Sequence, residues 1–351
     1  MSAIPAWPTR RHPAAIVEDA VNATLVRAQR RLGWRPAALG YTGYGAGPGV
    51  SGVYGDHGWV RVLGRVMLDR PSRADESVTT SRRGWRHFLT SHVAEASVTV
   101  EVAGTRHRVS ADRSGVIDAV LPVALVPGVH PVTFEPVGGA SGQGRVIVFG
   151  DTGFGLLSDI DDTVVVTLLP RPFIAAWNTF VLRETARHEV PGMSELYRRF
   201  TSSHPGATVV YLSTGPWNAA PTLRRFLNRY RFPDGPLLLT DWGPSNTGWF
   251  RSGREHKRAQ LARLAAELPG VRWLLIGDDG QRDPEIYEEF AAHHPAAVQA
   301  IVLRQLTPTE HVLSSGTPVP SEAPHEAVAI PHVSAPDGYG IGDELQRYGL
   351  I

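Results

Sequence analysis

Hydrophobic positions change their spacing twice along the chain, and each change predicts a different kind of structure. Between residues 13 and 32 apolar side chains recur every three or four positions, which predicts one helix, and Gly33 stands where that helix would end. From Trp59 to Phe149 short runs alternate apolar and polar positions between turn residues, as antiparallel strands do. From Gly155 onward apolar runs alternate with segments of helical spacing, which predicts parallel strands joined by helices.

The segment between Trp59 and Phe149 has the pattern of a small all-β domain. The alternating valines of 98–102, followed by Ala103-Gly104, predict a hairpin with residues 106–109. Further strands are expected at 116–121, 129–134 and 145–149. Because no cluster of candidate catalytic residues falls here, we expect an accessory domain with a sandwich-like arrangement.

A glycine-rich stretch, residues 40–58, lies between the first helix and these strands. It contains G-x-G spacings but lacks the strand–turn–helix context of a nucleotide-binding loop. We therefore expect a linker or an irregular segment at the edge of the β domain.

The second half of the chain alternates buried strands with helices. Strands are expected at 156–158, 208–212, 236–239, 271–276 and 298–303, and helices at 191–200, 219–230, 254–268 and 284–293. Such alternation predicts a parallel sheet with helices on both faces. After Leu306 the chain is rich in proline and serine until about Pro336, which predicts a loosely ordered tail, with a short docking helix over 343–351.

The expected fold class is therefore α/β, a Rossmann-like, doubly wound parallel sheet preceded by an all-β, sandwich-like domain and an N-terminal helix. The expected parts are an N-terminal helical segment (1–37), an accessory β domain (38–150), an α/β domain (151–306) and a Pro-rich tail with a short terminal helix (307–351).

Composition narrows the classes of function. The net charge of +1 gives no field that would attract nucleic acid, so no nucleic-acid partner is expected. The absence of cysteine excludes disulfides, thiolate nucleophiles and cysteine-based zinc sites. Residues 1–11 lack the apolar core of a secretory signal, and no apolar run approaches the length of about 18 residues that a membrane span needs. We expect a cytoplasmic protein, with peripheral membrane contact as the variant that a lipid substrate would require.

The first candidate for chemistry is a pair of carboxylates after the apolar run that begins at Leu156. Asp159 and Asp161 lie two residues apart, where a buried strand would meet solvent. Two acids this close repel each other unless a cation or a shared proton compensates, and Mg²⁺ is a cation that prefers oxygen ligands. The alternative is an acidic turn with no ligand.

The second candidate is a single lysine. The chain contains 35 Lys and Arg residues, of which only Lys257 is a lysine. An ammonium is a compact point charge, whereas a guanidinium is a broad planar fork. Either the lone lysine supplies a small positive charge beside a phosphoryl oxygen, or its presence is due to chance.

Other polar groups follow the remaining strands of this half. Ser213, Thr214 and Gly215 follow the second strand, and Gly277–Asp283 follows the fourth. Carboxylates, a hydroxyl and an ammonium at one edge of a sheet are the parts that phosphoryl transfer needs.

Four motifs in this order resemble the haloacid dehalogenase superfamily of aspartate-nucleophile phosphatases. They are DIDDT at 159–163, Ser213, Lys257 and GDDGQRD at 277–283, and the resemblance covers about residues 150–305. More narrowly, SDIDDT, YLSTGPW and IGDDGQRDPEIY behind a β-rich N-terminal region look like the actin-patch type of phosphatidate phosphatase. This resemblance implies a haloacid dehalogenase-like sheet with a small cap or none.

The resemblance also implies roles for the acidic residues. Asp159 would attack phosphorus and form an aspartyl-phosphate, and Asp161 would protonate the leaving alkoxide and then accept a proton from water. Mg²⁺ would be the cofactor, bound by Asp159, the backbone carbonyl of Asp161 and Asp278. Asp283 would either bind the metal or orient its ligands.

The remaining implied roles concern the substrate. Ser213 and Lys257 would bind oxygens of the transferred phosphoryl group. Thr163 would brace the loop, and Thr163, Thr214 and Gly215 are the expected substrate-binding residues. Asp162 is expected to be a bystander.

One position departs from the family pattern. Asp279 stands where a small hydroxyl is expected. It is a bystander, an alternative metal ligand or a neutral change, and the sequence does not distinguish these.

The expected substrate class follows from the spacing of the motifs. About forty residues separate Thr163 from Thr208, too few for a large cap domain. An open site suits a bulky or membrane-embedded phosphomonoester. The apolar segment 168–173, with Trp177 and Phe180, either enters a lipid interface or packs as a helix against the sheet.

The sequence thus predicts a Mg²⁺-dependent phosphomonoesterase that works through an aspartyl-phosphate, with phosphatidic acid at a membrane surface, converted to diacylglycerol, as the candidate substrate. Two alternatives stay open. One is a phosphatase of a soluble metabolite or a phosphoprotein, and the other is a non-enzymatic binding module built on the same fold.

Overall fold

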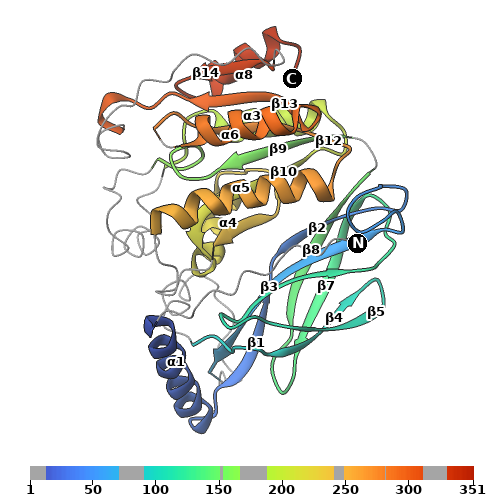
Figure 1. The fold of residues 1–351 in the computed structure, drawn as a ribbon, viewed down its shortest axis with the longest axis vertical. Helices are drawn as coiled ribbons and strands as arrows, with labels where there is room; N and C mark the ends of the chain where they lie inside the picture. Colours follow the sequence, from blue (N-terminus) through green and yellow to red (C-terminus); the bar gives the residue numbers. More distant parts are fainter. Residues whose placement is uncertain are drawn as a thin grey trace.

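The fold is given by a computed structural model that describes residues 13–70, 91–150, 153–166, 188–240, 249–280, 282–310 and 330–351, and gives no side chains for 13–21 and 249–252. The strands in this part of the chain form two sheets. An eight-stranded sheet lies beside a six-stranded sheet that is layered with helices (Figure 1). The predicted first helix is confirmed as α1 (Pro13–Arg31), and Gly33 follows it with a left-handed φ of 83°.

The N-terminal strands form one continuous sheet. Its strands are β1 (Arg35–Gly40), β2 (Thr42–Ala46), β3 (Trp59–Asp69), β4 (Ser97–Val102), β5 (Thr105–Ser110), β6 (Val116–Leu121), β7 (Gly128–Pro136) and β8 (Gly142–Phe149). Their order is β1-β3-β2-β8-β7-β4-β5, with β6 also paired to β3, and neighbours are antiparallel except for the parallel pair β2–β8. A sandwich-like arrangement was expected, and the structure has a single hydrogen-bonded sheet of eight strands. Many of its buried side chains form a hydrophobic cluster of their own.

The predicted hairpin at 103–104 is confirmed. Ala103 and Gly104 both have positive φ angles, 49° and 78°, between the antiparallel strands β4 and β5. Positive φ at both central positions matches the right-handed twist of the flanking strands.

The expectation of a linker within residues 40–58 is wrong for its first part, because β2 is a fully buried strand between β3 and β8. A Cβ added to Gly43 would lie 2.1 Å from the carbonyl oxygen of Arg61, and one added to Gly45 would lie 2.2 Å from that of Trp59. Glycine is required here because the chains approach so closely. Since glycine contributes no apolar side chain, the hydropathy pattern does not reveal such a strand.

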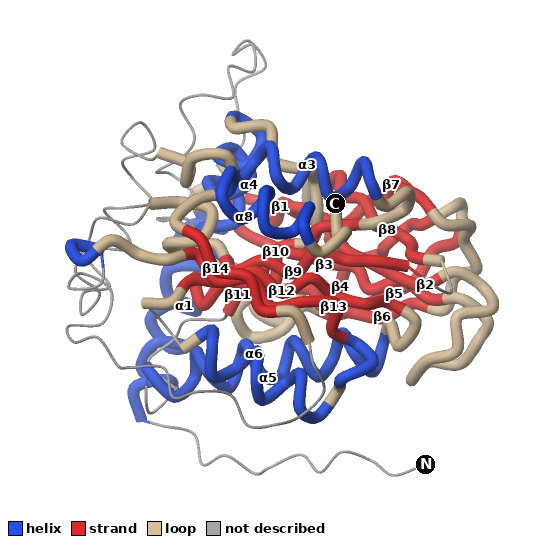
Figure 2. The backbone as a smooth tube through the Cα atoms, turned by 90° about the horizontal axis from the view of Figure 1, so that it is seen from above, coloured by secondary structure: helices blue, strands red, loops and turns tan. Residues whose placement is uncertain are grey.

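The second half of the chain has the predicted alternation. Its elements are β9 (Gly153–Asp159), α3 (Met193–Ser203), β10 (Thr208–Pro216), α4 (Ala220–Arg229), β11 (Leu237–Thr240), α5 (Trp249–Glu267), β12 (Val271–Asp278), α6 (Asp283–His293) and β13 (Val298–Arg304). The strands are parallel in the order β11-β10-β9-β12-β13-β14. Figure 2 shows helices on both faces, with α3, α4 and α8 on one side and α5 and α6 on the other.

The expected loosely ordered tail is corrected at its end. β14 (His332–Ala335) adds a sixth parallel strand beside β13, and α8 (Gly338–Arg347) packs near α3. The side chain of Asp337 accepts a hydrogen bond from the Gly340 amide and caps this helix, whose Ile341 and Leu345 are fully buried. The predicted terminal helix therefore exists but begins earlier than residue 343. A four-residue strand among prolines is too short for its pattern to stand out.

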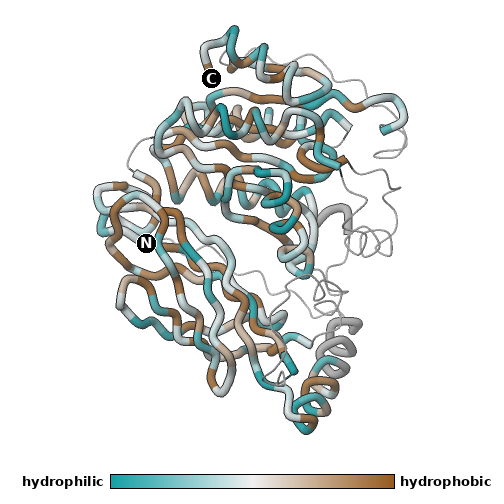
Figure 3. The backbone as a smooth tube through the Cα atoms, turned by 180° about the vertical axis from the view of Figure 1, so that it is seen from behind, coloured by the Kyte–Doolittle hydropathy of each residue, from teal (hydrophilic) through white to brown (hydrophobic). Residues whose placement is uncertain are grey.

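The two sheets share a hydrophobic core. Buried residues of the first sheet, among them Tyr44, Trp59 and Phe149, form one cluster with the strands of the second sheet. Figure 3 shows the apolar stretches concentrated along the strands of both sheets. Trp273 of β12 makes an edge contact with the Phe149 ring and covers Gly155, where any side chain would collide with the indole. Among the described residues, no helix has the length and hydropathy that crossing a bilayer demands.

The close approach at β2 generates a stability prediction. Gly45→Ala should lower the free energy of unfolding by about 1–3 kcal/mol, because the added methyl group overpacks the strand against Trp59. Gly153→Ala is the matched control, since a Cβ there meets no atom within 4 Å. The control should stay within about 0.5 kcal/mol of the wild type in urea titrations. Equal midpoints for the two variants would show that β2 is not packed in this way.

Candidate active site

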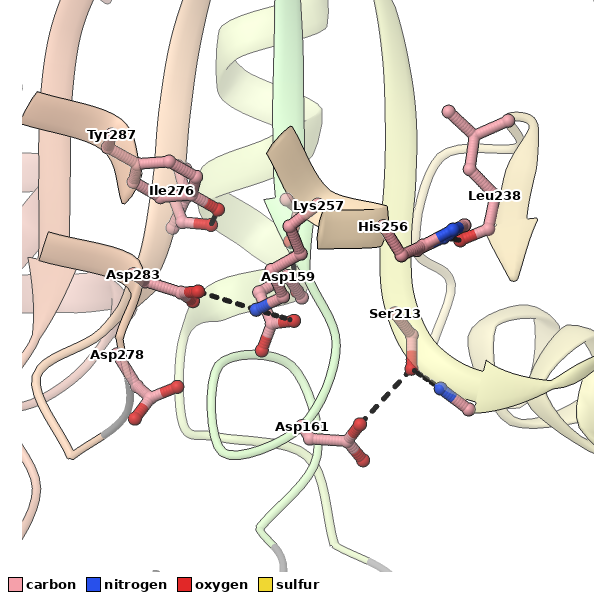
Figure 4. Close-up of polar contacts among 12 residues, drawn as sticks. Asp159, Asp161, Ser213, Leu238, His256, Lys257, Ile276, Asp278, Asp283 and Tyr287 are labelled. Atoms are coloured by element: carbon pink, nitrogen blue, oxygen red, sulfur yellow. Dashed lines mark hydrogen bonds and ion pairs between the residues drawn. The ribbon is translucent and has the colours of Figure 1, made fainter. Parts of the chain in front are cut away.

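The candidate site lies where three parallel strands end. β9 is flanked by β10 and β12, so the order of the sheet runs outward from β9 in both directions. In open α/β sheets, ligands bind beyond the carboxyl ends of the strands at such a point. Asp159 is the last residue of β9 and Asp278 the last of β12, while Ser213 lies in the final part of β10. These three side chains are buried, and Figure 4 shows them at the ends of their strands.

Lys257 is the centre of the charged groups. Its Nζ lies 2.7 Å from Oδ1 of Asp159 and donates a hydrogen bond of 2.5 Å to Oδ1 of Asp283. Lys257 comes from the middle of α5, and Asp283 is the first residue of α6. All three side chains are almost fully buried, with exposures between 1 and 4%. The structure therefore brings the single lysine of the chain to the predicted nucleophile.

The electrostatics of this cluster follow from burial and from an excess of carboxylates. The pKa of Asp159 is raised to about 8, chiefly because the group is buried; Lys257 acts in the lowering direction, and Asp283 and Asp161 in the raising direction. Burial alone would lower the pKa of Lys257, but Asp159 and Asp283 hold it above its ordinary value. One ammonium cannot neutralise this many carboxylates, so the cluster favours an additional cation or a retained proton.

The carboxylates have the arrangement of a site for a hard cation. Asp159, Asp278 and Asp283 each contribute an oxygen to a group whose members lie within 4.8 Å of one another. Oδ2 of Asp159 and Oδ2 of Asp283 are buried and accept no hydrogen bond from the described residues. Each of these two aspartates thus uses one oxygen for Lys257 and has the other available for a ligand. A set of buried carboxylate oxygens suits Mg²⁺.

Ser213, the second of the four motifs, is hydrogen-bonded to Asp161. Ser213 donates a hydrogen bond of 3.1 Å from its Oγ to Oδ2 of Asp161, and the same Oγ accepts the Gly215 amide at 3.0 Å. The predicted catalytic residues Asp161 and Ser213 are therefore neighbours (Figure 4).

The predicted substrate-binding residues differ in their placement. Thr163 is fully buried, and its hydroxyl has no hydrogen-bond partner among the described residues. The side chain of Thr214 lies against Gly253 of α5, and the carbonyl groups of Thr214 and Gly215 accept hydrogen bonds from Thr240. Their role in substrate binding stays a prediction.

Arg304 was missed by the sequence analysis. It lies buried at the end of β13 and donates a hydrogen bond of 2.7 Å to the carbonyl of Asp162, which has a left-handed φ of 59°. The same guanidinium donates to Glu310 and to the Pro336 carbonyl, so it joins the first motif loop to the C-terminal segment. The sequence did contain one sign of this role, because a charged residue directly after a predicted buried strand lies at the edge of the sheet where the site is expected.

The two aspartates described as bystanders have structural contacts. Asp162 is buried and supplies that carbonyl to Arg304. Oδ1 of Asp279 accepts the Leu306 amide at 2.8 Å, which ties the fourth motif to the chain after β13. Residues 168–180, the apolar segment considered for lipid contact, lie outside the described residues.

Comparison with known proteins agrees with these motifs. Residues 154–305 match the family described as "Phosphatidate phosphatase APP1, catalytic domain". This part of the chain is therefore similar to that family. The resemblance to the actin-patch type of phosphatidate phosphatase is thus confirmed.

Two relatives are each similar to a little under half of the chain. An uncharacterized protein of Schizosaccharomyces pombe is 29% identical over 163 residues, which is 46% of this chain and 27% of that protein. The phosphatidate phosphatase APP1 of Saccharomyces cerevisiae is 25% identical over 155 residues, 43% of this chain and 26% of that protein. The matched segment thus spans about a quarter of the length of each relative.

Solved structures give only weak similarity. The alignment with a carbohydrate acetylesterase from Xanthomonas citri covers 73% of this chain and 68% of the esterase chain, with a TM-score of 0.27 and 14% sequence identity. A similarity of this strength carries no argument about fold or function.

The buried charges generate a second stability prediction. Lys257→Met should lower the free energy of unfolding in EDTA by about 3–5 kcal/mol, because it leaves buried carboxylates facing one another without a cation. Arg258→Met is the matched control, since Arg258 pairs at the surface with Glu289 and should cost at most about 1 kcal/mol. Denaturant titration measures both. A Lys257→Met protein as stable as the control would contradict the charge arrangement described here.

Proposed function

We propose that this chain is a Mg²⁺-dependent phosphomonoesterase of the haloacid dehalogenase type, with phosphatidic acid as the substrate. The observation that carries the proposal is the pairing of the single lysine with Asp159 and Asp283 beside Asp278. A buried ammonium among carboxylates at the ends of parallel strands provides a positive charge for the phosphoryl oxygens and negative charges for a nucleophile and a metal ion, and phosphoryl transfer requires both.

The topology supports the assignment to the superfamily. The strand order β11-β10-β9-β12-β13, with helices on both faces, is that of a doubly wound sheet, and Asp159 stands at its switch point. The family match over residues 154–305 supports a phosphatase and a phospholipid substrate. Since the match covers about a quarter of its relatives, the activity and substrate of those whole proteins are proposals for this chain.

In the proposed reaction, an oxygen of Asp159 attacks phosphorus and the bond from phosphorus to the ester oxygen breaks. Asp161 donates its proton to the leaving alkoxide, which departs as an alcohol. Asp161 then takes a proton from a water molecule, whose oxygen attacks the aspartyl-phosphate. Inorganic phosphate leaves, and Asp159 is a carboxylate again.

The other polar residues have distinct roles in this proposal. Lys257 and Ser213 bind the equatorial oxygens of the phosphoryl group, where charge accumulates in the transition state. Without substrate the Ser213 hydroxyl donates its one hydrogen bond to Asp161, and in the proposed complex it would donate to the phosphoryl group instead. Asp159, Asp278 and Asp283 would hold Mg²⁺, since their oxygens are close together and buried. Mg²⁺, when bound, supplies charge neutralisation at the phosphoryl oxygens.

The nucleophile assignment is tested by Asp159→Asn. Turnover of phosphatidic acid in liposomes should fall by at least about a thousandfold, because an amide oxygen is a poor nucleophile. Asp343→Asn is the control, since Asp343 is exposed on α8, and it should turn over like the wild type. Full activity of Asp159→Asn would reject the mechanism. Turnover of sugar phosphates with none on lipid would favour the soluble-metabolite phosphatase, and no turnover of any ester would favour a binding module.

Metal binding is tested without an activity assay. Adding Mg²⁺ to EDTA-treated protein should raise the melting temperature, because a ligand that binds only the folded state stabilises it. Asp278→Asn should abolish most of this shift by removing one ligand charge. Asp343→Asn should retain it. Identical shifts in Asp278→Asn and the wild type would place the Mg²⁺ site elsewhere.

A further inference from the structure

The eight-stranded sheet contacts the two segments that carry Lys257 and Ser213. The first contact is at the end of α5. Glu267, the last residue of this helix, is buried, and its carboxylate accepts hydrogen bonds from Tyr44 at 2.6 Å, from Tyr54 at 3.0 Å and from Arg61. All three donors belong to β2, β3 or the loop between them.

The helix itself gives no reason for Glu267. A carboxylate at the C-terminus of a helix is unfavourable because it faces the negative end of the helix dipole. A buried charge also costs free energy unless it is paired and hydrogen-bonded. Among the described residues, the hydrogen bonds to the Glu267 carboxylate come from the other sheet. The same loop also donates the Val53 amide to the carbonyl of Ala266 at 3.3 Å, which satisfies a carbonyl of the last turn.

A second link joins α5 to the same sheet one turn earlier. Arg263 donates a hydrogen bond of 3.0 Å to Asp118 of β6, and Asp118 also pairs with Arg61. Glu267, Arg61, Asp118 and Arg263 thus form a network that crosses from helix to sheet. We call these four residues the anchor network.

The second contact lies after the Ser213 segment. Trp217 follows β10 and stacks on Tyr41, with ring centroids 5.3 Å apart and planes at 10°. Arg65 of β3 donates a hydrogen bond to Asn218, and Arg224 of α4 donates one of 2.6 Å to Thr42. The sheet therefore holds both segments that supply donors to the candidate site.

Packing between these contacts is incomplete. An open pocket of about 230 Å³ lies between these contacts, lined by Leu63 of the sheet, by Trp217 and by His256 of α5. Because apolar side chains do not fill this space, the position of α5 relative to the sheet depends more on the polar contacts of the anchor network. His256 is also the residue before Lys257.

We propose that the eight-stranded sheet positions Lys257 by anchoring α5, and that Glu267 is a positioning residue that acts through Lys257. Lys257 precedes Glu267 by ten residues, about 15 Å along the helix axis. A tilt of about 5° about the anchored end would displace Lys257 by about 1.3 Å. A misplacement of about 1 Å can reduce turnover by about a hundredfold. The effect of the anchor on turnover rests on the proposed function.

The test compares a substitution at the end of α5 with one on α6, a helix that contacts α5. Glu267→Gln removes the charge from the anchor network and keeps the shape of the side chain. Glu289→Gln makes the same chemical change in α6, where Glu289 pairs with Arg258 of α5 at the surface. In assays with para-nitrophenyl phosphate, Glu267→Gln should lower kcat by about tenfold to a hundredfold, with KM within about twofold. Glu289→Gln should match the wild type.

The single lysine provides a readout that does not need activity. An amine-modifying reagent followed by peptide mass spectrometry reports on Lys257 alone, apart from the N-terminal amine. Lys257 is 3% exposed, so modification should be slow in the wild type and in Glu289→Gln. It should be several times faster in Glu267→Gln. If the wild type hydrolyses no ester, the proposed function fails, and the modification rate still decides whether the sheet anchors Lys257.

A double-mutant cycle separates positioning from a general loss of fold. In a Lys257→Arg background, Glu267→Gln should cause little further loss of turnover, because the group it positions is already absent. An equal fractional loss in both backgrounds would overturn the proposal, as would unchanged kcat and unchanged modification in folded Glu267→Gln. If Glu267→Gln does not fold, Tyr44→Phe removes one hydrogen bond of the anchor and should change both readouts in the same direction. No change in Tyr44→Phe would then count against the anchor.

Discussion

The whole site depends on one ammonium shared by two buried carboxylates. Lys257 contacts Asp159 and Asp283, which come from a strand end and from a helix start that are distant in sequence. Burying two carboxylates costs free energy unless an ammonium or a metal ion compensates for the lost hydration. The ion pair is therefore a condition for burying the site, and in the proposed reaction it places a positive charge beside the phosphoryl group.

The arrangement of the sheets explains how this pair is maintained. β9 and β12 are adjacent parallel strands, so Asp159 and Asp278 emerge at one edge. The loop after β9 is fixed by Arg304, which binds the Asp162 carbonyl where the backbone is left-handed. The eight-stranded sheet contacts the far end of α5 through Glu267 and Arg263. In the inference drawn above, these contacts make the sheet part of what positions Lys257, while its expected role as an accessory domain stays a prediction.

The sequence predicted those features that depend on local pattern. Helical and strand spacing located the elements between β9 and β13, and strand ends located Asp159, Ser213 and Asp278. The lone lysine was informative because the chain otherwise uses arginine. The resemblance to a known family implied roles for these residues, which spacing alone leaves open.

Features that depend on contacts between distant segments were not predictable in this way. β2 was missed because its glycines are required by the approach of β3 and contribute no hydropathy signal. β14 was missed because four residues among prolines make too short a pattern. Glu267 and Arg304 are ordinary charged residues in sequence, and their importance arises only from the partners that folding gives them. The expected domain boundaries stay a prediction, although the hydrophobic core continues across the boundary expected at residue 150.

The most direct test of the central claim is a crystal structure of the protein with Mg²⁺ and beryllium fluoride, which mimics a phosphoryl group on an aspartate. The account predicts beryllium bonded to an oxygen of Asp159, the metal bound by Asp159 and Asp278, and the Lys257 ammonium facing a fluoride. Beryllium fluoride bound elsewhere, or a metal distant from Asp159, would contradict it.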